Sequence, residues 1–170
     1  AYEADFFATN EREIAFSRWM EINRPDITVK TARFATASAA GLEADQLMND
    51  YPKIAGLFVV WDTPCIAVIT AVSKRNPALP MTTVDLGREV TESLAKGGPV
   101  IGIAGQRPFQ QGEAVARTTI TALLDRRCPD WVALPGLKVS RSNVIECYQS
   151  IWREQAPRDI LIGFDLTQTK

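Results

Sequence analysis

Apolar and polar positions along the chain predict helices and strands that follow one another almost to the end. Apolar residues three or four positions apart mark the helices, whereas β-branched alternation or short continuous apolar runs mark the strands. The predicted helices are 10–22, 38–50, 63–75, 88–96, 107–126 and 140–152. The predicted strands are 27–35, 54–61, 80–87 and 100–106, and the segment 131–136 is predicted to be a strand or an extended chain. Proline or glycine stands at most of the boundaries. The segment 156–170 has no clear period, so we expect it to be extended or partly mobile.

The apolar run from Phe58 to Val72, FVVWDTPCIAVITAV, is interrupted by polar residues where its strand ends. Thr63 can cap the following helix, and a proline in the first turn loses no hydrogen bond. Within that helix, Ile66, Ile69 and Val72 are the predicted inner stripe. In the first predicted helix, Ile14, Ala15, Trp19 and Ile22 form the predicted inner face.

Helices of 10 to 15 residues between strands predict an α/β fold with a mostly parallel sheet and helices on both faces. Ligands of such sheets bind beyond the carboxyl ends of the strands. The pair Trp61-Asp62, Asp85 and Gln106 each follow a predicted strand, so we expect them at one edge. Arg12 joins them if the chain before its helix is also a strand.

Indole, guanidinium, carboxylate and carboxamide groups at one edge suit a sugar, whose C–H face packs on the ring while its hydroxyls bond to the charged groups. Structural roles also explain each residue. Trp61 can be a core residue at a strand end, and Asp62 can sit at a helix N-terminus for its dipole. Asp85 can cap the next helix, and Arg12 can be an exposed first-turn cation. Gln106 alone carries little information.

The composition excludes several classes of function. With 46% hydrophobic and 23% charged residues the chain is an ordinary globular one, and a net charge of −1 gives no basic face for nucleic acid. The absence of histidine excludes Ser-His and Cys-His nucleophile pairs and histidine-based zinc sites. The three cysteines show no CxxC spacing, so we expect buried free thiols and neither metal nor cofactor.

Four segments in order, ATNEREIAF, GLFVVWDTPCIAVITAV, MTTVDLG and GGPVIGIAGQRPFQQG, resemble the second half of type 1 periplasmic sugar-binding proteins. These are the solute receptors of ABC importers, of the ribose-binding kind, and they share a fold with the effector domains of lac-repressor-like regulators. The resemblance implies sugar contacts at Arg12, Asp85 and Gln106. Trp61 replaces the usual asparagine of ribose binders, which implies ring stacking there. The full expected ligand-binding set is Asn10, Arg12, Trp61, Asp62, Asp85 and Gln106.

Members of this family have two lobes and about twice this length. The resemblance therefore implies a fragment in which 1–106 is the second lobe, 107–130 is a helix crossing to the first lobe, and 131–170 is the C-terminal return segment and tail. The central first strand of the second lobe would be mostly missing, and the helix 108–126 would lack the sheet that it covers. A second copy of the chain is expected to cover these surfaces, as a homodimer.

Three functions remain open at this stage. The first is the solute-binding component of an ABC importer, which binds a monosaccharide or polyol and docks on a membrane permease in the periplasm. The second is the effector-sensing domain of a cytoplasmic transcriptional regulator, which free cysteines favour. The third is an enzyme that uses Asp62 and Asp85 as acid and base. Of the three, we do not favour the enzyme, and we expect the chain to have no enzyme activity.

Overall fold

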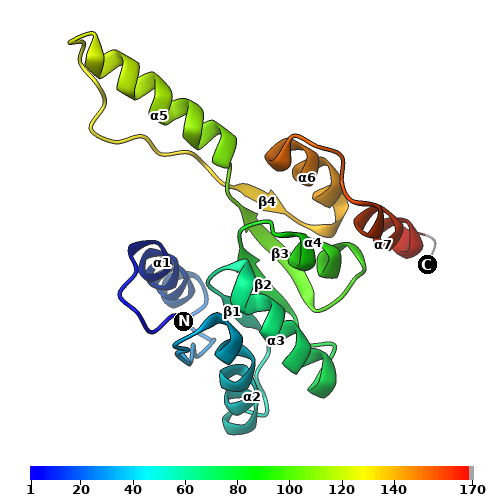
Figure 1. Cartoon of the computed structure of the whole chain (residues 1–170). Helices are drawn as coiled ribbons and strands as arrows, with labels where there is room; N and C mark the ends of the chain where they lie inside the picture. The colour runs from blue at the N-terminus through cyan, green and yellow to red at the C-terminus, as the bar shows by residue number, and fades with distance from the viewer. Residues whose placement is uncertain (169–170) are drawn as a thin grey trace.

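The computed structural model describes residues 1–168, and in this range the chain builds an α/β fold on a four-stranded sheet (Figure 1). The strands lie in chain order; the first three are parallel, and the fourth is antiparallel to the third. The strands are β1 (Leu57–Val59), β2 (Met81–Val84), β3 (Val100–Gly105) and β4 (Leu137–Val139). The predicted α/β class with a mostly parallel sheet is confirmed.

Helices surround this sheet, and most of them begin near the breaks that the sequence predicts (Figure 1). They are α1 (Phe7–Asn23), α2 (Ala40–Asp50), α3 (Asp62–Arg75), α4 (Arg88–Ala95), α5 (Pro108–Leu123), α6 (Val144–Trp152) and α7 (Arg158–Gln168). Short 3-10 turns precede α2 and α6. Across residues 1–168, none of the helices has the length and apolar character that crossing a membrane requires.

The buried face of α3 differs from the predicted stripe. Val72 is buried as expected, but Ile66 is exposed and Ile69 is only half-buried. Cys65 and Val68 are buried in their place. The helix carries apolar residues on nearly every side, so spacing alone does not fix which side turns toward the sheet.

The predicted inner face of α1 is wrong, because Ile14, Trp19 and Ile22 are all exposed. The helix packs instead through Phe16, whose ring stacks on that of Phe58 with a centroid distance of 4.5 Å and an interplanar angle of 16°. Since successive residues of a strand point to opposite faces, α1 lies on one face of β1 and the buried side chain of Val59 on the other.

The segment 27–35, predicted as a strand, forms no ladder. Its one bridge is a parallel pairing of Phe34 with Tyr2. A strand needs a hydrogen-bonding neighbour, and beyond this bridge the segment borders a groove rather than another strand.

The C-terminal part decides between two alternatives and corrects one expectation. Of the alternatives for 131–136, the strand is not formed, and the pairing with β3 is made just after this segment, by β4. The segment expected to be extended or partly mobile instead forms α7, which packs against α4 and buries Ile160 completely. Pro157 stands before the helix, and its carbonyl accepts hydrogen bonds from the N–H groups of Ile160 and Leu161. Residues 169 and 170 lie outside the described range.

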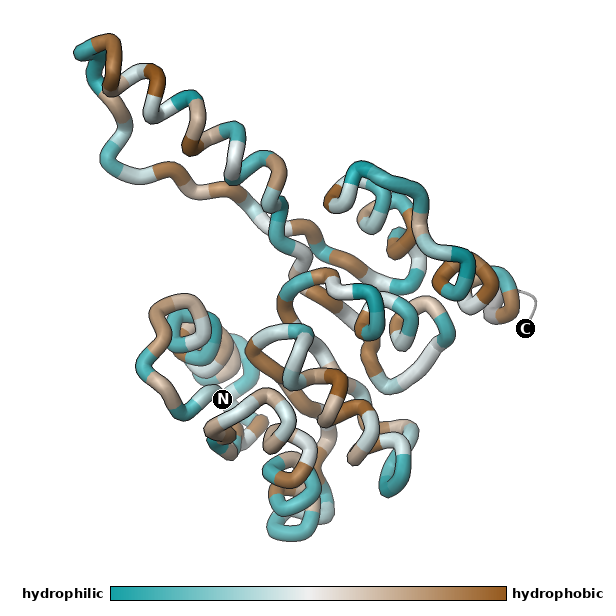
Figure 2. Tube along the Cα trace, viewed as in Figure 1, coloured by the Kyte–Doolittle hydropathy of each residue, from teal (hydrophilic) through white to brown (hydrophobic). Residues whose placement is uncertain are grey.

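Helix α5 projects from the body of the molecule, and the chain returns alongside it to β4 (Figure 1). None of its residues is buried, and Val115, Ile120 and Leu123 are exposed as the sequence led us to expect. The hydropathy colouring shows apolar residues along both the helix and its return segment (Figure 2). This arm therefore presents apolar surface to solvent.

Candidate functional site

Arg12 is the centre of a polar cluster at the carboxyl ends of β1 and β2. Its Nη1 donates to the carbonyl oxygen of Val60 at 2.9 Å and to Asp85 Oδ2 at 3.1 Å, and its Nη2 donates to Asp85 Oδ1 at 3.2 Å. A guanidinium has five N–H donors. Three of the five are used in these bonds, so two of its N–H groups lie outside this network.

Asp85 reaches Arg12 because the backbone turns sharply after β2. Its φ of 71° is left-handed, a conformation that aspartate tolerates better than most residues. Its N–H still donates to the Ala104 carbonyl at 3.0 Å, so the turn starts from the edge of the ladder. Burial raises the pKa of the Asp85 carboxyl above its ordinary value; Arg12 opposes this shift, and Asp62 adds to it.

Asp62 is the first residue of α3, where the helix dipole favours a carboxylate. Its Oδ2 lies directly over Gly87, and a Cβ added at Gly87 would stand only 2.3 Å from that oxygen. Glycine at this position therefore lets the two loops that follow β1 and β2 approach each other. The carboxylates of Asp62 and Asp85 consequently interact across the same edge.

Trp61 is the N-cap residue of α3 and is half-buried. Its ring meets Tyr2 edge-on, with centroids 5.1 Å apart, and Phe34 at 5.5 Å. These three rings form an aromatic cluster that joins the N-terminal segment to the end of β1. The structural role that the sequence allowed for Trp61 is thus present, and part of the indole remains open to solvent.

Asn10 and Gln106 lie outside this network. The Asn10 side chain donates to Asp5 at 2.7 Å, within the start of α1. Gln106 follows β3 and accepts a hydrogen bond from Gln111 at 3.3 Å. The fold therefore brings Arg12, Asp62 and Asp85 together. The ring of Trp61 packs against Tyr2 and Phe34, and the roles of Trp61, Asn10 and Gln106 in binding stay predictions.

A supporting residue that the sequence did not indicate is Trp152, in the last turn of α6. Its side chain is exposed, and its Nε1 donates to the Leu86 carbonyl at 2.9 Å. This bond holds the turn that carries Asp85 and Gly87. Because 66 residues separate its two partners, no local pattern could have revealed it.

The cluster of Arg12, Asp62 and Asp85 combines hydrogen-bond donors and acceptors, and solvent reaches part of it. The side chains of Arg12 and Asp85 are 17% and 29% exposed, so their pair is partly shielded from water. A group with several hydroxyls could bond to both charged partners without breaking their pair. The arrangement suits recognition of a polyhydroxylated molecule.

Solved structures of sugar receptors share this architecture. A solute-binding protein of an ABC transporter from Agrobacterium vitis, bound to α-D-tagatopyranose, aligns with a TM-score of 0.74 and 19% identity over 88% of this chain and 50% of that one. The chain has the fold of the type 1 periplasmic sugar-binding proteins.

Two further sugar-binding proteins agree with this assignment. A carbohydrate transporter solute-binding protein from Agrobacterium radiobacter, in complex with D-arabinose, gives a TM-score of 0.73 and 18% identity over 84% of this chain and 50% of that one. Another solute-binding protein from Agrobacterium vitis, with bound allitol, gives a TM-score of 0.70 and 18% identity over 81% of this chain and 51% of that one. The chain thus spans about half the length of these sugar-binding proteins. No protein-family model and no curated protein matches it.

Proposed function

We propose that the chain is part of the solute-binding component of an ABC-type sugar importer, which binds a monosaccharide or related polyol between two lobes. The observation that carries this proposal is the bidentate Arg12–Asp85 pair beside Trp61 at the carboxyl edge of the sheet. The bound tagatose, arabinose and allitol of the structural neighbours support the choice of ligand class.

In this proposal Arg12 donates to ring or hydroxyl oxygens, Asp85 and Asp62 accept from hydroxyls, and Trp61 packs on the apolar face of the sugar. Asn10 and Gln106 complete the ligand set from the rim. Residues 1–106 then form the second lobe, 107–130 are the helix that crosses to the first lobe, and 131–170 are the C-terminal return segment and tail. Closure of the lobes would hide the sugar and create the form that a membrane permease recognises in the periplasm.

No step of this function breaks a covalent bond. The structural neighbours are solute-binding transport proteins, which supports binding rather than catalysis. The Asp62 and Asp85 carboxylates then act only as hydrogen-bond acceptors.

Titration of the 15N-labelled chain with D-tagatose, D-arabinose and allitol tests the proposal. Half of a cleft encloses a ligand poorly, so we expect weak binding that shifts the amide signals around Arg12, Trp61 and Asp85. Arg12→Lys should weaken it by about tenfold, because one ammonium cannot bridge two oxygens as a guanidinium does.

Arg24→Lys is the matched control, since Arg24 makes a similar bidentate pair with Asp26 at an exposed position. It should leave sugar binding unchanged. Equal loss of binding in both variants, or shifts confined to other surfaces, would refute the assignment.

A second candidate is the effector-sensing domain of a cytoplasmic regulator with the same fold. The three cysteines are free thiols in the structure, and Cys65 and Cys147 are buried, which suits a reducing compartment. Fractionation of cells that produce the intact protein separates the two candidates: recovery with the periplasmic fraction supports the receptor, and recovery with the cytosol supports the regulator.

We also propose that the isolated chain pairs with a second copy through the apolar arm of α5. Val115, Ile120 and Leu123 are all exposed within one copy. Light scattering after size-exclusion chromatography should give twice the monomer mass. Leu123→Glu should shift the mass toward the monomer, whereas Glu113→Gln on the same helix should not.

A further inference from the structure

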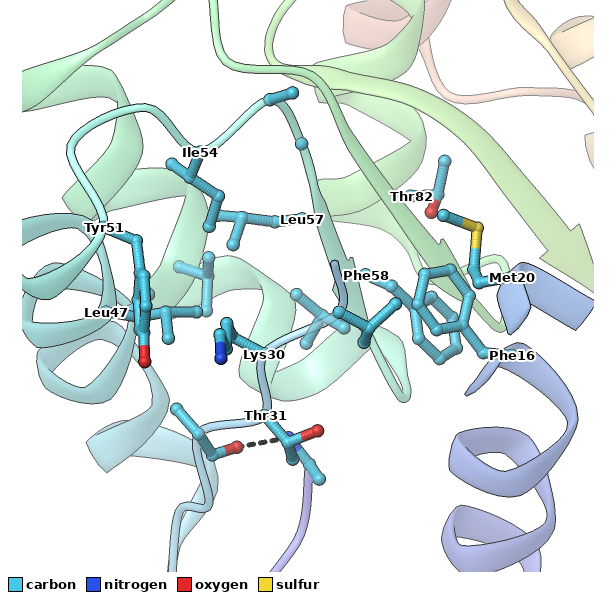
Figure 3. A pocket seen from close by; sticks show the side chains of 18 of the residues that line it. Phe16, Met20, Lys30, Thr31, Leu47, Tyr51, Ile54, Leu57, Phe58 and Thr82 are labelled. Carbon is cyan, nitrogen blue, oxygen red and sulfur yellow. Dashed lines mark hydrogen bonds between the residues drawn. The ribbon is translucent and has the colours of Figure 1, made fainter. Parts of the chain in front are cut away.

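The side of α1 that faces away from the sheet carries exposed apolar side chains. Phe16 points from α1 toward β1, where its ring stacks on Phe58 (Figure 3). Because each residue turns an α-helix by about 100°, Phe7, Ile14 and Ile22 lie on the other side of the helix. Their side chains are 74%, 41% and 77% exposed, and α1 stands at the outer edge of the molecule (Figure 1). Apolar side chains gathered in this way mark an interaction surface.

Two charged residues lie on the same side of α1, between these apolar residues. We call the five residues together the α1 seam, which consists of Phe7, Glu11, Ile14, Arg18 and Ile22. Members of the seam follow one another every three or four residues, which is the spacing of a stripe that contacts another helix. Glu11 and Arg18 are exposed, and among residues 1–168 neither makes an ion pair. The seam therefore offers unpaired charges of both signs.

The α1 seam is complementary to itself when two copies of the helix lie antiparallel. The point midway between Glu11 and Arg18 is also midway between Phe7 and Ile22. A twofold axis through this point, beside Ile14, places Glu11 opposite Arg18 of the second copy. The same axis places Phe7 opposite Ile22 of the second copy. Each of these contacts forms twice, as an interface between identical surfaces requires.

The two charges also select the direction of pairing. In a parallel pair in the same register, Glu11 would face Glu11 of the second copy and Arg18 would face Arg18. Like charges at such a contact repel, whereas the antiparallel pair joins opposite charges at both places. The seam therefore favours one orientation of its partner and disfavours the other.

The α1 seam does not use the groups of the candidate sugar site. Arg12 lies about 100° round the helix from Glu11, and there it bonds to Asp85. Val115, Ile120 and Leu123 of the apolar arm belong to α5, a different helix. The seam is thus a surface separate from both.

We propose that two copies of the chain associate through the α1 seam as an antiparallel helix pair, in which Glu11 of each copy bonds to Arg18 of the other. The paired stretch from Phe7 to Ile22 is about 22 Å long. One face of a single helix is a small interface, so the dissociation constant should be about 0.1–1 mM. The contact therefore forms only at higher protein concentrations than a size-exclusion column maintains.

Sedimentation equilibrium at protein concentrations up to about 1 mM tests this proposal. All variants carry Leu123→Glu, which disrupts the apolar arm of α5. Glu11→Arg and Arg18→Glu should each raise the dissociation constant by about tenfold, because each change brings like charges together at both symmetric contacts. Glu11→Arg combined with Arg18→Glu restores opposite charges, so its dissociation constant should return to within about threefold of the parent value.

Matched substitutions on other helices serve as controls. Glu89→Arg alters the net charge as Glu11→Arg does, at an exposed position of α4, and it should leave association unchanged. Ile14→Lys, at a side chain 41% exposed, should prevent association, whereas Ile66→Lys on α3, at a side chain 38% exposed, should not. Circular dichroism checks that each variant remains folded.

Three results would overturn the proposal. The first is a chain that stays monomeric at the highest concentration, and the second is a dimer whose dissociation constant ignores the single charge reversals. The third is a double variant as weak as the single ones, since Glu11 and Arg18 would then not face each other. The measurement involves neither sugar nor the apolar arm, so the earlier proposals stand or fall separately.

Discussion

Replacing Arg12 with methionine should destabilise the fold by about 2 kcal/mol at pH 7, and it should do so through Asp85. The substitution keeps most of the apolar stem but removes the two bonds to the carboxylate and the bond to the Val60 carbonyl. Breaking a fully buried pair costs about 3–5 kcal/mol, and an exposed pair contributes less than about 1 kcal/mol. Side chains that are 17% and 29% exposed lie between these limits.

The loss of stability in Arg12→Met should depend on pH, because Asp85 titrates. The pKa of Asp85 is raised in the fold, because burial outweighs the opposing effect of Arg12. A carboxyl with a raised folded pKa contributes stability below its unfolded pKa and loses it as the pH rises through the folded value. Without Arg12 the folded pKa rises further. The deficit of Arg12→Met should therefore be small near pH 4 and grow toward pH 7.

Urea unfolding of the wild type, Arg12→Met, Asp85→Asn and the double variant measures the coupling directly. We expect a coupling free energy of about 1–2 kcal/mol at pH 7 that largely disappears at acidic pH. The Asp85→Asn background should show no growth of the Arg12 deficit with pH. A coupling below about 0.5 kcal/mol at pH 7, or one that is equal at both pH values, would refute the reasoning.

Three other outcomes follow from the contacts. Trp152→Phe should cost about 1 kcal/mol in urea unfolding, since it loses its bond to the turn after β2, whereas Trp131→Phe, at an exposed position, should stay within about 0.5 kcal/mol. Burial raises the pKa of Cys65 to about 12, so iodoacetamide at pH 8 should leave it unmodified while the half-exposed Cys128 reacts, as peptide mass spectrometry would show. Equal labelling of the two thiols would contradict this. Gly87→Ala should push aside the carboxylate at the start of α3 and lower the pKa of the neighbouring Asp85 carboxyl, measured by NMR titration; an unchanged pKa would show that the carboxylate did not move.

The sequence predicted the helices and strands that are marked by neighbouring residues, such as a proline, a glycine or a short apolar run. Proline and glycine set the start of α5 and the gap between α4 and β3, and a short apolar run marked β1. The segment 27–35 has the composition of a strand, yet it forms no ladder, because strand formation depends on a neighbour that composition does not supply. Helix α7 was missed because its apolar residues show no clear helical period before their packing against α4 is known.

Some residues of the candidate site could likewise be predicted from the sequence, and others could not. The rule that parallel strands end at one edge placed Asp62 and Asp85 together, and it included Arg12 on the condition that a strand precedes its helix. The same rule placed Gln106 at this edge, but its hydrogen-bond partner is Gln111. The rule could not place Trp152, whose bond to Leu86 depends on how α6 folds back over the sheet. It also could not separate the aromatic packing of Trp61 from a role in binding, since both use the same half-buried ring.

Helix α1 carries the arginine of the candidate sugar site, so the contacts that hold this helix also position the site. Arg12 reaches Asp85 from α1, and α1 is held against the sheet by the stacking of Phe16 on Phe58. The segment before α1 is held by the backbone bonds of Ala1 and Glu3 to the segment 32–34 and by the ring contact of Tyr2 with Trp61. Because a guanidinium binds two oxygens only when its plane is correctly oriented, the bidentate pairing of Arg12 with Asp85 depends on these contacts, although none of them touches the carboxylate.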